Sequence, residues 1–130
     1  MANLSDLLGS TFEGNTGPAG PQGIQGSAGA PNVPQNSKTT SYTLAIGDVG
    51  KHISITTGGV TVPSGVFSAG DIVSVYNNSG SNQTITQGAS TTLRNAGTAD
   101  TGDRTLAQYG LCTILCVASN TFIISGAGIS

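Results

Sequence analysis

Six glycines occupy every third position between residues 14 and 29, and no other feature of this sequence restricts its fold as strongly. They are Gly14, Gly17, Gly20, Gly23, Gly26 and Gly29. In a collagen triple helix every third residue faces an axis shared by three chains, and only a residue without a Cβ fits there. Pro18 and Pro21 follow two of these glycines and favour the polyproline II conformation. The pattern predicts a triple-helical rod over residues 14–31 and a homotrimer, with a flexible linker as the alternative.

The composition excludes several classes of function. Only 8% of the 130 residues are charged, the net charge is −2, and the basic residues are Lys38, Lys51, Arg94 and Arg104. Because four basic residues cannot form the basic surface that binds the phosphate backbone of a nucleic acid, we expect no nucleic-acid partner. The sequence contains no long apolar run and no signal-peptide pattern at its start. We therefore expect no membrane insertion, and synthesis in a cytoplasm.

The segments on either side of the rod differ in character. Leu4, Leu7 and Leu8 lie at near-helical spacing in residues 1–13, which are too short to bury three leucines on their own. This segment is either a frayed end or, as we expect, a peptide that docks on a partner. Residues 32–38 follow the last triplet, and their composition predicts a linker.

From residue 39 onward, short β-branched segments alternate with glycine-rich turns, which predicts an all-β domain over residues 39–130. The expected strands are 40–46, 51–56, 60–63, 71–77, 83–87, 91–94, 104–109, 111–118 and 121–125. Ile53 and Ile55 alternate with polar residues, so each strand should have one buried face and one wet face. Strands at this spacing predict an antiparallel β-sandwich or jelly-roll-like barrel. The predicted core is Leu44, Ile46, Ile53, Ile55, Val62, Phe67, Ile72, Val73, Val75, Ile85, Leu93, Leu106, Ile114, Phe122 and Ile124.

The sequence predicts no catalytic, metal or cofactor site. The triplet Asp100-Thr101-Gly102 has the letters of the aspartic-protease motif, but it lies in a polar loop without a preceding apolar strand. His52 is the only histidine and has no motif around it. Cys112 and Cys116 point to the same face of one strand, too far apart to pair with each other. We expect them to be reduced core thiols, with contact between thiols of neighbouring protomers as the alternative.

Sugar binding is the remaining candidate for a small-ligand function. The sequence has three tyrosines and no tryptophan, and Tyr76 stands beside two amide side chains, Asn77 and Asn78. An aromatic ring with neighbouring amides is typical of carbohydrate sites. These residues are the candidate glycan contact, with cross-strand packing of Tyr76 as the alternative.

Five stretches of the last 90 or so residues resemble the β-domains of tailed-bacteriophage virion proteins: SYTLAIGDVGKHISIT, VTVPSGVFSAGDIVSVYNNSGSNQTITQG, TTLR, AQYG and NTFIISG. Such domains belong to fibre-like and decoration proteins and often follow a collagen-like segment. The start MANLSDLLG is similar to that of cyanophage structural proteins. The resemblance implies a non-enzymatic, homotrimeric short fibre or decoration protein on the virion surface, made in the cytoplasm of a bacterial host.

That resemblance also implies the partners. The docking peptide with Leu4, Leu7 and Leu8 would bind a capsid or tail structural protein, and the β-domain would form the tip. The alternative is a receptor-binding module of a tail fibre or tail tip, which recognises a host surface glycan.

Overall fold

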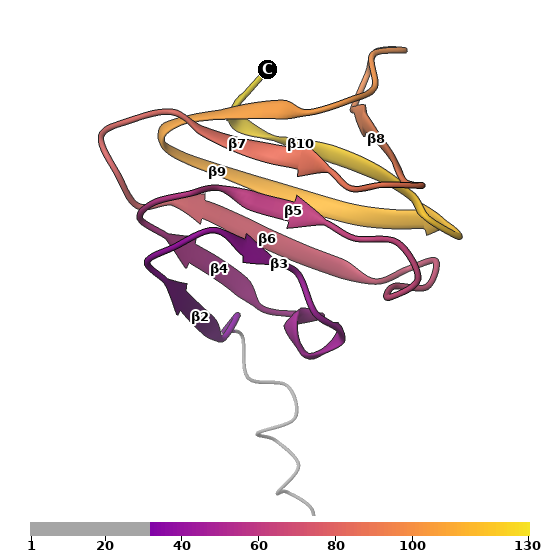
Figure 1. Cartoon of the computed structure of the whole chain (residues 1–130), viewed down its shortest axis with the longest axis horizontal. Coiled ribbons are helices and arrows are strands. Elements are labelled where there is room, and N and C mark those ends of the chain that lie inside the picture. Colours follow the sequence, from indigo (N-terminus) through magenta and orange to yellow (C-terminus); the bar gives the residue numbers. More distant parts are fainter. Residues whose placement is uncertain (1–31) are drawn as a thin grey trace, which may run out of the picture. The chain divides into compact units, whose positions relative to one another are not determined.

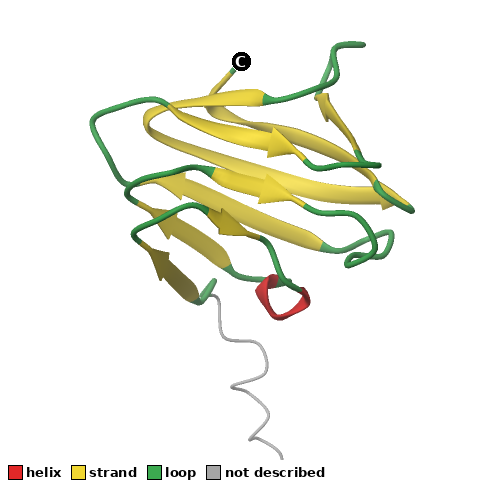
Figure 2. Cartoon of the chain, viewed as in Figure 1, coloured by secondary structure: helices red, strands yellow, loops and turns green. Residues whose placement is uncertain are grey.

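The computed structural model describes residues 32–130, and the regular secondary structure of this part of the chain is almost entirely β-strand (Figures 1 and 2). The strands are β2 (Gln35–Lys38), β3 (Tyr42–Thr43), β4 (His52–Ile55), β5 (Val60–Val62), β6 (Ile72–Asn77), β7 (Gln83–Gln87), β8 (Thr92–Asn95), β9 (Arg104–Ala118) and β10 (Thr121–Ile129). One turn of 3₁₀ helix, η2 (Ile46–Asp48), precedes β4. The all-β prediction is confirmed. The predicted docking peptide and rod, residues 1–13 and 14–31, lie outside the described residues.

Strands β2 to β7 form a coil with two layers. β2, β4 and β6 are parallel neighbours in one layer, and β3, β5 and β7 are parallel neighbours in the other. The chain crosses between the layers after each strand, so each circuit adds one strand to each layer (Figure 1). This arrangement is a short β-solenoid, in which each circuit is stabilised mainly by its neighbours.

The solenoid corrects the predicted antiparallel sandwich or jelly roll. Five of the eight strand pairs are parallel, and all three antiparallel pairs are made by β9. The turns at residues 56–59 and 78–82 carry the chain to the opposite layer, although their glycine and asparagine content is equally typical of hairpins. Side chains alternate with a period of two in both kinds of sheet, so alternation does not reveal the strand direction.

Strand β9 closes the last circuit of the coil. Its residues 104–106 pair with β7, and its residues 111–115 pair with β6, so one strand joins both layers. Between these segments Tyr109 has a φ of 54°. Gly110 follows it because a Cβ there would lie 2.7 Å from the side chain of Leu106. β10 covers the other edge of β9, and β8 pairs with β10.

The space between the two layers is filled with apolar side chains that stack in register from one strand to the next. Ile53, Val75 and Cys112 form one such row. Thirteen of the fifteen predicted core residues are buried, but Ile46 and Ile72 are 62% and 43% exposed. Ile46 lies on the 3₁₀ turn, and Ile72 shares the outward face of β6 with Ser74, so both predictions were wrong.

Strand β2 lies inside the segment 32–38 that was predicted to be a linker. The compact unit spans Val33–Ser130, so the folded region begins earlier than residue 39. The polar residues Asn36 and Lys38 of β2 pair with Ile53 and Ile55 of β4, which are buried. Among the strands of residues 32–130, β2 has a neighbour on only one side, and the end of a solenoid needs polar residues where its circuits stop.

Candidate functional site

Asn77 is the centre of a buried hydrogen-bond network at the corner where β6 leads into β7. Its side chain is fully buried. The Nδ2 group donates to the carbonyl oxygens of Ser81, Leu106 and Ala107, at 2.7, 3.1 and 3.0 Å. A single side chain therefore holds both the turn at residues 78–82 and strand β9.

Gln83 extends this network to the preceding circuit. Asn77 Oδ1 accepts hydrogen bonds from Gln83 Nε2 at 2.8 Å and from Ser79 Oγ at 2.6 Å. Gln83 Nε2 also lies 3.2 Å from the carbonyl oxygen of Ile55, and Gln83 Oε1 accepts from the backbone nitrogen of Gly59 at 3.0 Å. We call Asn77, Ser79 and Gln83 the corner network. Buried amide groups satisfied in this way fix the geometry of a corner.

A second polar cluster covers the first circuit of the solenoid, and we call Asn36, Lys38, Tyr42 and Asp48 the end cap. Asp48 is only 2% exposed. Its Oδ1 accepts from Asn36 Nδ2 at 2.9 Å, and its Oδ2 accepts from Tyr42 Oη at 2.7 Å and from the backbone nitrogen of Ala45 at 2.8 Å. Lys38 Nζ lies 4.4 Å from the centre of the Tyr42 ring, a cation–π geometry.

The environment of Asp48 favours its charged form. Burial acts to raise the pKa of this carboxyl, but the hydrogen bonds from Tyr42, Ala45 and Asn36, with the charge of Lys51, outweigh burial and lower the pKa. Burial and the Asp48 carboxylate raise the pKa of the Tyr42 phenol. At neutral pH the end cap therefore holds a carboxylate and a neutral phenol in contact.

Replacing Asp48 with Asn should lower the free energy of unfolding at pH 7 by about 2–3 kcal/mol, because hydrogen bonds to a charged group are lost. The pKa of Asp48 is lower in the folded chain than in the unfolded one, where it is about 3.9. Its contribution is therefore complete above that value and is lost as the pH falls through the folded pKa.

The measurement is urea unfolding of both proteins between pH 3 and 7, at one protein concentration. The difference between wild type and Asp48→Asn should be constant from pH 7 to 5 and shrink below about pH 4. Asp100→Asn, which removes an exposed loop carboxylate, is the control and should stay within about 0.5 kcal/mol of wild type. An Asp48 effect that is equally large at pH 3 would contradict the assigned charge.

Exposed apolar side chains gather on the outer surface of β6 and β9. Ile72 pairs with Leu115, and Tyr76 pairs with Leu111, so the side chains form rows that cross both strands. Leu111 is 52% exposed and Val117 is 44% exposed. We call Ile72, Tyr76, Leu111, Leu115 and Val117 the apolar face. Ser74 and Thr113 lie between the two rows, and exposed apolar side chains clustered in this way are typical of interaction sites.

A groove of about 300 Å³ lies at one end of the apolar face. It is lined by Val33, His52, Ser74, Tyr76 and Leu111. His52 Nδ1 lies 3.0 Å from the carbonyl oxygen of Val33, and His52 Nε2 lies 3.1 Å from Oε1 of Gln35. The only histidine thus has a structural contact, and it holds the segment that leads into β2 beside the apolar face.

The structure does not bring the predicted glycan contacts together. Tyr76 faces outward on β6, Asn77 faces the interior, and Asn78 is exposed in the following turn. Asn77 has no free polar atom for a ligand, because the corner network uses both ends of its amide. The alternation of the sequence already indicated that Asn77 is buried, since Asn77 shares the inward face of β6 with Val73 and Val75.

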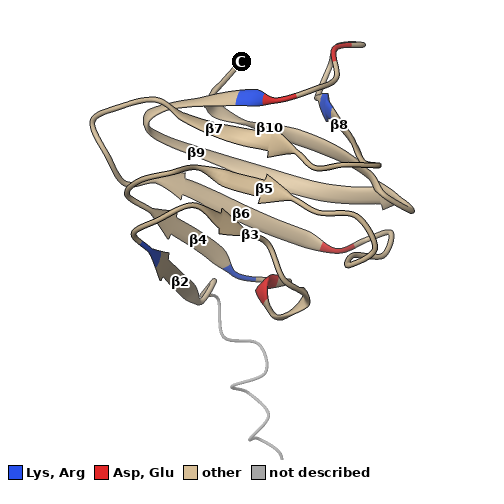
Figure 3. Ribbon diagram, viewed as in Figure 1, with Lys and Arg blue, Asp and Glu red and all other residues tan. Residues whose placement is uncertain are grey.

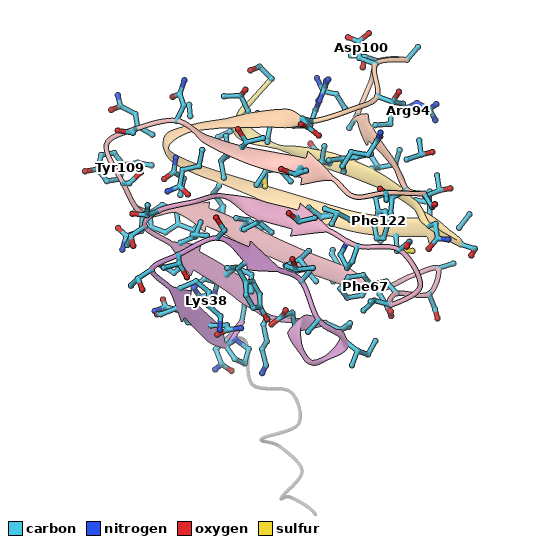
Figure 4. All side chains as sticks on the ribbon, viewed as in Figure 1. Lys38, Phe67, Arg94, Asp100, Tyr109 and Phe122 are labelled. Carbon is cyan, nitrogen blue, oxygen red and sulfur yellow. The ribbon has the colours of Figure 1, made fainter. Side chains whose placement is uncertain are left out.

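Tyr109 was not among the residues predicted from the sequence; it is 60% exposed and lies next to the turn at residues 78–82 (Figure 4). Its backbone nitrogen donates to the carbonyl oxygen of Ser79 at 3.1 Å. A polar groove of about 210 Å³ lies at the same turn. It is lined by Thr56, Thr57, Gly58, Ser79, Ser81, Asn82 and Gln83. This volume is below the roughly 300–1,000 Å³ of most ligand pockets, so the groove suits a surface contact better than an enclosed ligand.

The two cysteines are buried in the core, and Asp71 and Asp103 bond to turns. Cys112 and Cys116 are free and buried, as predicted, and burial raises the pKa of Cys112 to about 12. Both side chains lie inside the coil, which contradicts the alternative of thiol contact between protomers. Asp71 Oδ2 accepts from the backbone nitrogen of Ser68 at 2.9 Å, and Asp103 Oδ1 accepts from that of Gln87 at 2.9 Å.

Within residues 32–130, the His, Cys, Asp and Glu side chains form no group of three that could hold a metal ion. The same region contains no helix with the length and apolar character of a membrane span.

Comparison with protein-family models, with curated proteins and with solved structures gives no match for this chain. The class defined by the described residues is an all-β protein with a short, capped β-solenoid.

Proposed function

We propose that this chain is a non-enzymatic structural protein of a bacteriophage virion, a trimeric short fibre or decoration protein displayed on the capsid surface. The observation that carries the proposal is the order of the two parts. A glycine register of six triplets leads, within a few residues, into the first strand of a solenoid. Six triplets are too few to hold three chains together alone, so the solenoid domain would set the register of the rod.

The chemistry of the described residues supports a scaffold. The corner network, the end cap and the contacts of His52, Asp71 and Asp103 all use their polar atoms to fix turns and circuits. Such side chains stabilise a shape and leave few reactive groups for chemistry. The resemblance to phage β-domains and the leucines of residues 1–13 extend the proposal to the partners: two further copies of the chain, and a capsid or tail protein.

Gly20→Val should open the rod locally, because a branched side chain at the axis does not fit among three chains. Gln22→Val is the matched control, since it adds the same side chain at a position away from the axis. Limited proteolysis near residue 20 should be faster in the glycine variant by about tenfold or more, which needs a local destabilisation of only about 1.4 kcal/mol.

The solenoid should survive as a resistant fragment in both variants, because its strands pair with one another within residues 35–129. Equal digestion of Gly20→Val, Gln22→Val and wild type would instead favour a flexible linker over residues 14–31.

A receptor-binding module for a host surface glycan is the second candidate function. The exposed residue Tyr109, which bonds to the turn that lines the polar groove, favours it, because aromatic rings and hydroxyl or amide groups are the usual components of glycan contacts. Glycan-array binding by the full chain that is lost in Tyr109→Ala would support this candidate. Binding that persists in that variant would exclude the Tyr109 surface as the receptor site.

A further inference from the structure

The apolar face differs in chemistry from the rest of the solenoid surface. The outward residues of the opposite layer are threonines, at Thr43, Thr61, Thr84 and Thr86. The apolar face instead presents large side chains, and the polar pair between its rows, Ser74 and Thr113, lies within 3.5 Å of each other. Within residues 32–130, the Lys, Arg and Asp side chains lie at strand ends, in turns and on β8, away from the centre of β6 and β9 (Figure 3).

The position of Val33 relates this face to the glycine register. Gly29 is the last glycine of the register, and four residues of extended chain span at most about 14 Å. Val33 itself lines the groove at the end of the apolar face, with Tyr76 and Leu111. If three chains leave a common triple helix at Gly29, their three Val33 residues lie within about 14 Å of the end of that helix.

We propose that the apolar face is the surface through which three copies of this chain associate, with the groove end at Tyr76 and Leu111 closest to the threefold axis. This inference rests on the homotrimer of the proposed function and adds the surface that forms it. In a threefold assembly a residue at the axis meets its own copies, so a self-complementary apolar side chain such as Leu111 fits there.

The other exposed apolar residues of the described region do not offer an equivalent surface. Ile46 lies on the 3₁₀ turn and Val49 directly follows it, whereas Tyr109 lies at the corner beside the turn at residues 78–82.

The test is the mass of full-length variants, measured by sedimentation equilibrium at about 10 µM. At this concentration a trimer with a dissociation constant of about 1 µM or below is assembled, whereas a much weaker one dissociates. Leu111→Asp would bring three carboxylates together near the axis, and Leu115→Asp would bury a carboxylate in an apolar interface, so each variant should convert the trimer to a monomer. Ile46→Asp and Thr84→Asp add the same charge to exposed positions elsewhere and should remain trimeric. Circular dichroism should show unchanged β-structure in all four variants, since each altered residue is exposed.

The outcomes separate this inference from the function on which it rests. A wild-type monomer would overturn the homotrimer itself. A wild-type trimer that persists in both leucine variants, or that dissociates equally in the two controls, would overturn the apolar face as its interface.

Thiol labelling gives a second measurement, which does not depend on whether the aspartate variants remain folded. A cysteine introduced by Leu111→Cys should react with a maleimide several times more slowly than one introduced by Ile46→Cys, because only the first lies in the interface. The native thiols are buried and give little background. Equal reactivity of the two introduced cysteines in a trimer would contradict the proposed interface.

Discussion

Replacement of Asn77 by alanine should destabilise the solenoid by about 3–5 kcal/mol, a large share of the roughly 5–15 kcal/mol that holds a domain folded. The substitution removes the donor for three carbonyl oxygens and the acceptor for Ser79 and Gln83. Each polar group left buried without a partner costs about 1–3 kcal/mol, and some relaxation reduces the sum. The free energy of unfolding in urea measures the effect, at a fixed protein concentration because the assembly contributes to stability.

Asn78→Ala provides the matched control for this prediction. Asn78 is the same residue type one position along the chain, but its side chain is exposed. Its backbone nitrogen bonds to Ile55, and that bond does not depend on the side chain. The control should change the free energy of unfolding by less than about 0.5 kcal/mol. An Asn77→Ala effect below 1 kcal/mol would show that the corner network is not needed.

Replacement of Leu4, Leu7 and Leu8 by serine should abolish association of the protein with phage particles. Burial of a leucine contributes about 1.5–3 kcal/mol, so three leucines would supply most of the affinity of a short docking peptide. A trimer multiplies the loss, because three linked peptides can bind three copies of the partner. Co-purification of the tagged protein with particles on a density gradient measures the association.

A variant with methionine at the same three positions is the control, since methionine keeps an apolar side chain of similar volume. It should remain bound to particles, and both variants should remain folded trimers. If the serine variant still decorates particles at normal occupancy, attachment belongs to the β-domain and the direction of the fibre is reversed.

The sequence was sufficient to predict where most strands lie and which side chains fill the core. Alternation of Ile53 with Ile55, and of Val73 with Val75, identifies inward positions because side chains on a strand repeat every two residues. The same rule places Ile72 and Tyr76 outside and Asn77 inside, so it also contained the clue to the corner network. An amide at an inward position must find partners within the protein.

The direction of the strands and the end cap could not be predicted in the same way. Alternation is identical in parallel and antiparallel strands, and a turn such as residues 56–59 gives no sign of whether it leads to a neighbour or to the opposite layer. The polar sequence of β2 resembles a linker because its inward residues cover the end of the coil rather than fill it. The apolar face depends on the pairing of β6 with β9, residues that lie far apart in the sequence.

The mass of the unmodified full-length protein tests the central claim most directly. The claim is that three copies form one structural unit, so sedimentation equilibrium should give three times the 12.8 kDa chain mass across a range of micromolar concentrations. A mass of 12.8 kDa at tens of micromolar, or a stable dimer, would contradict the trimeric fibre.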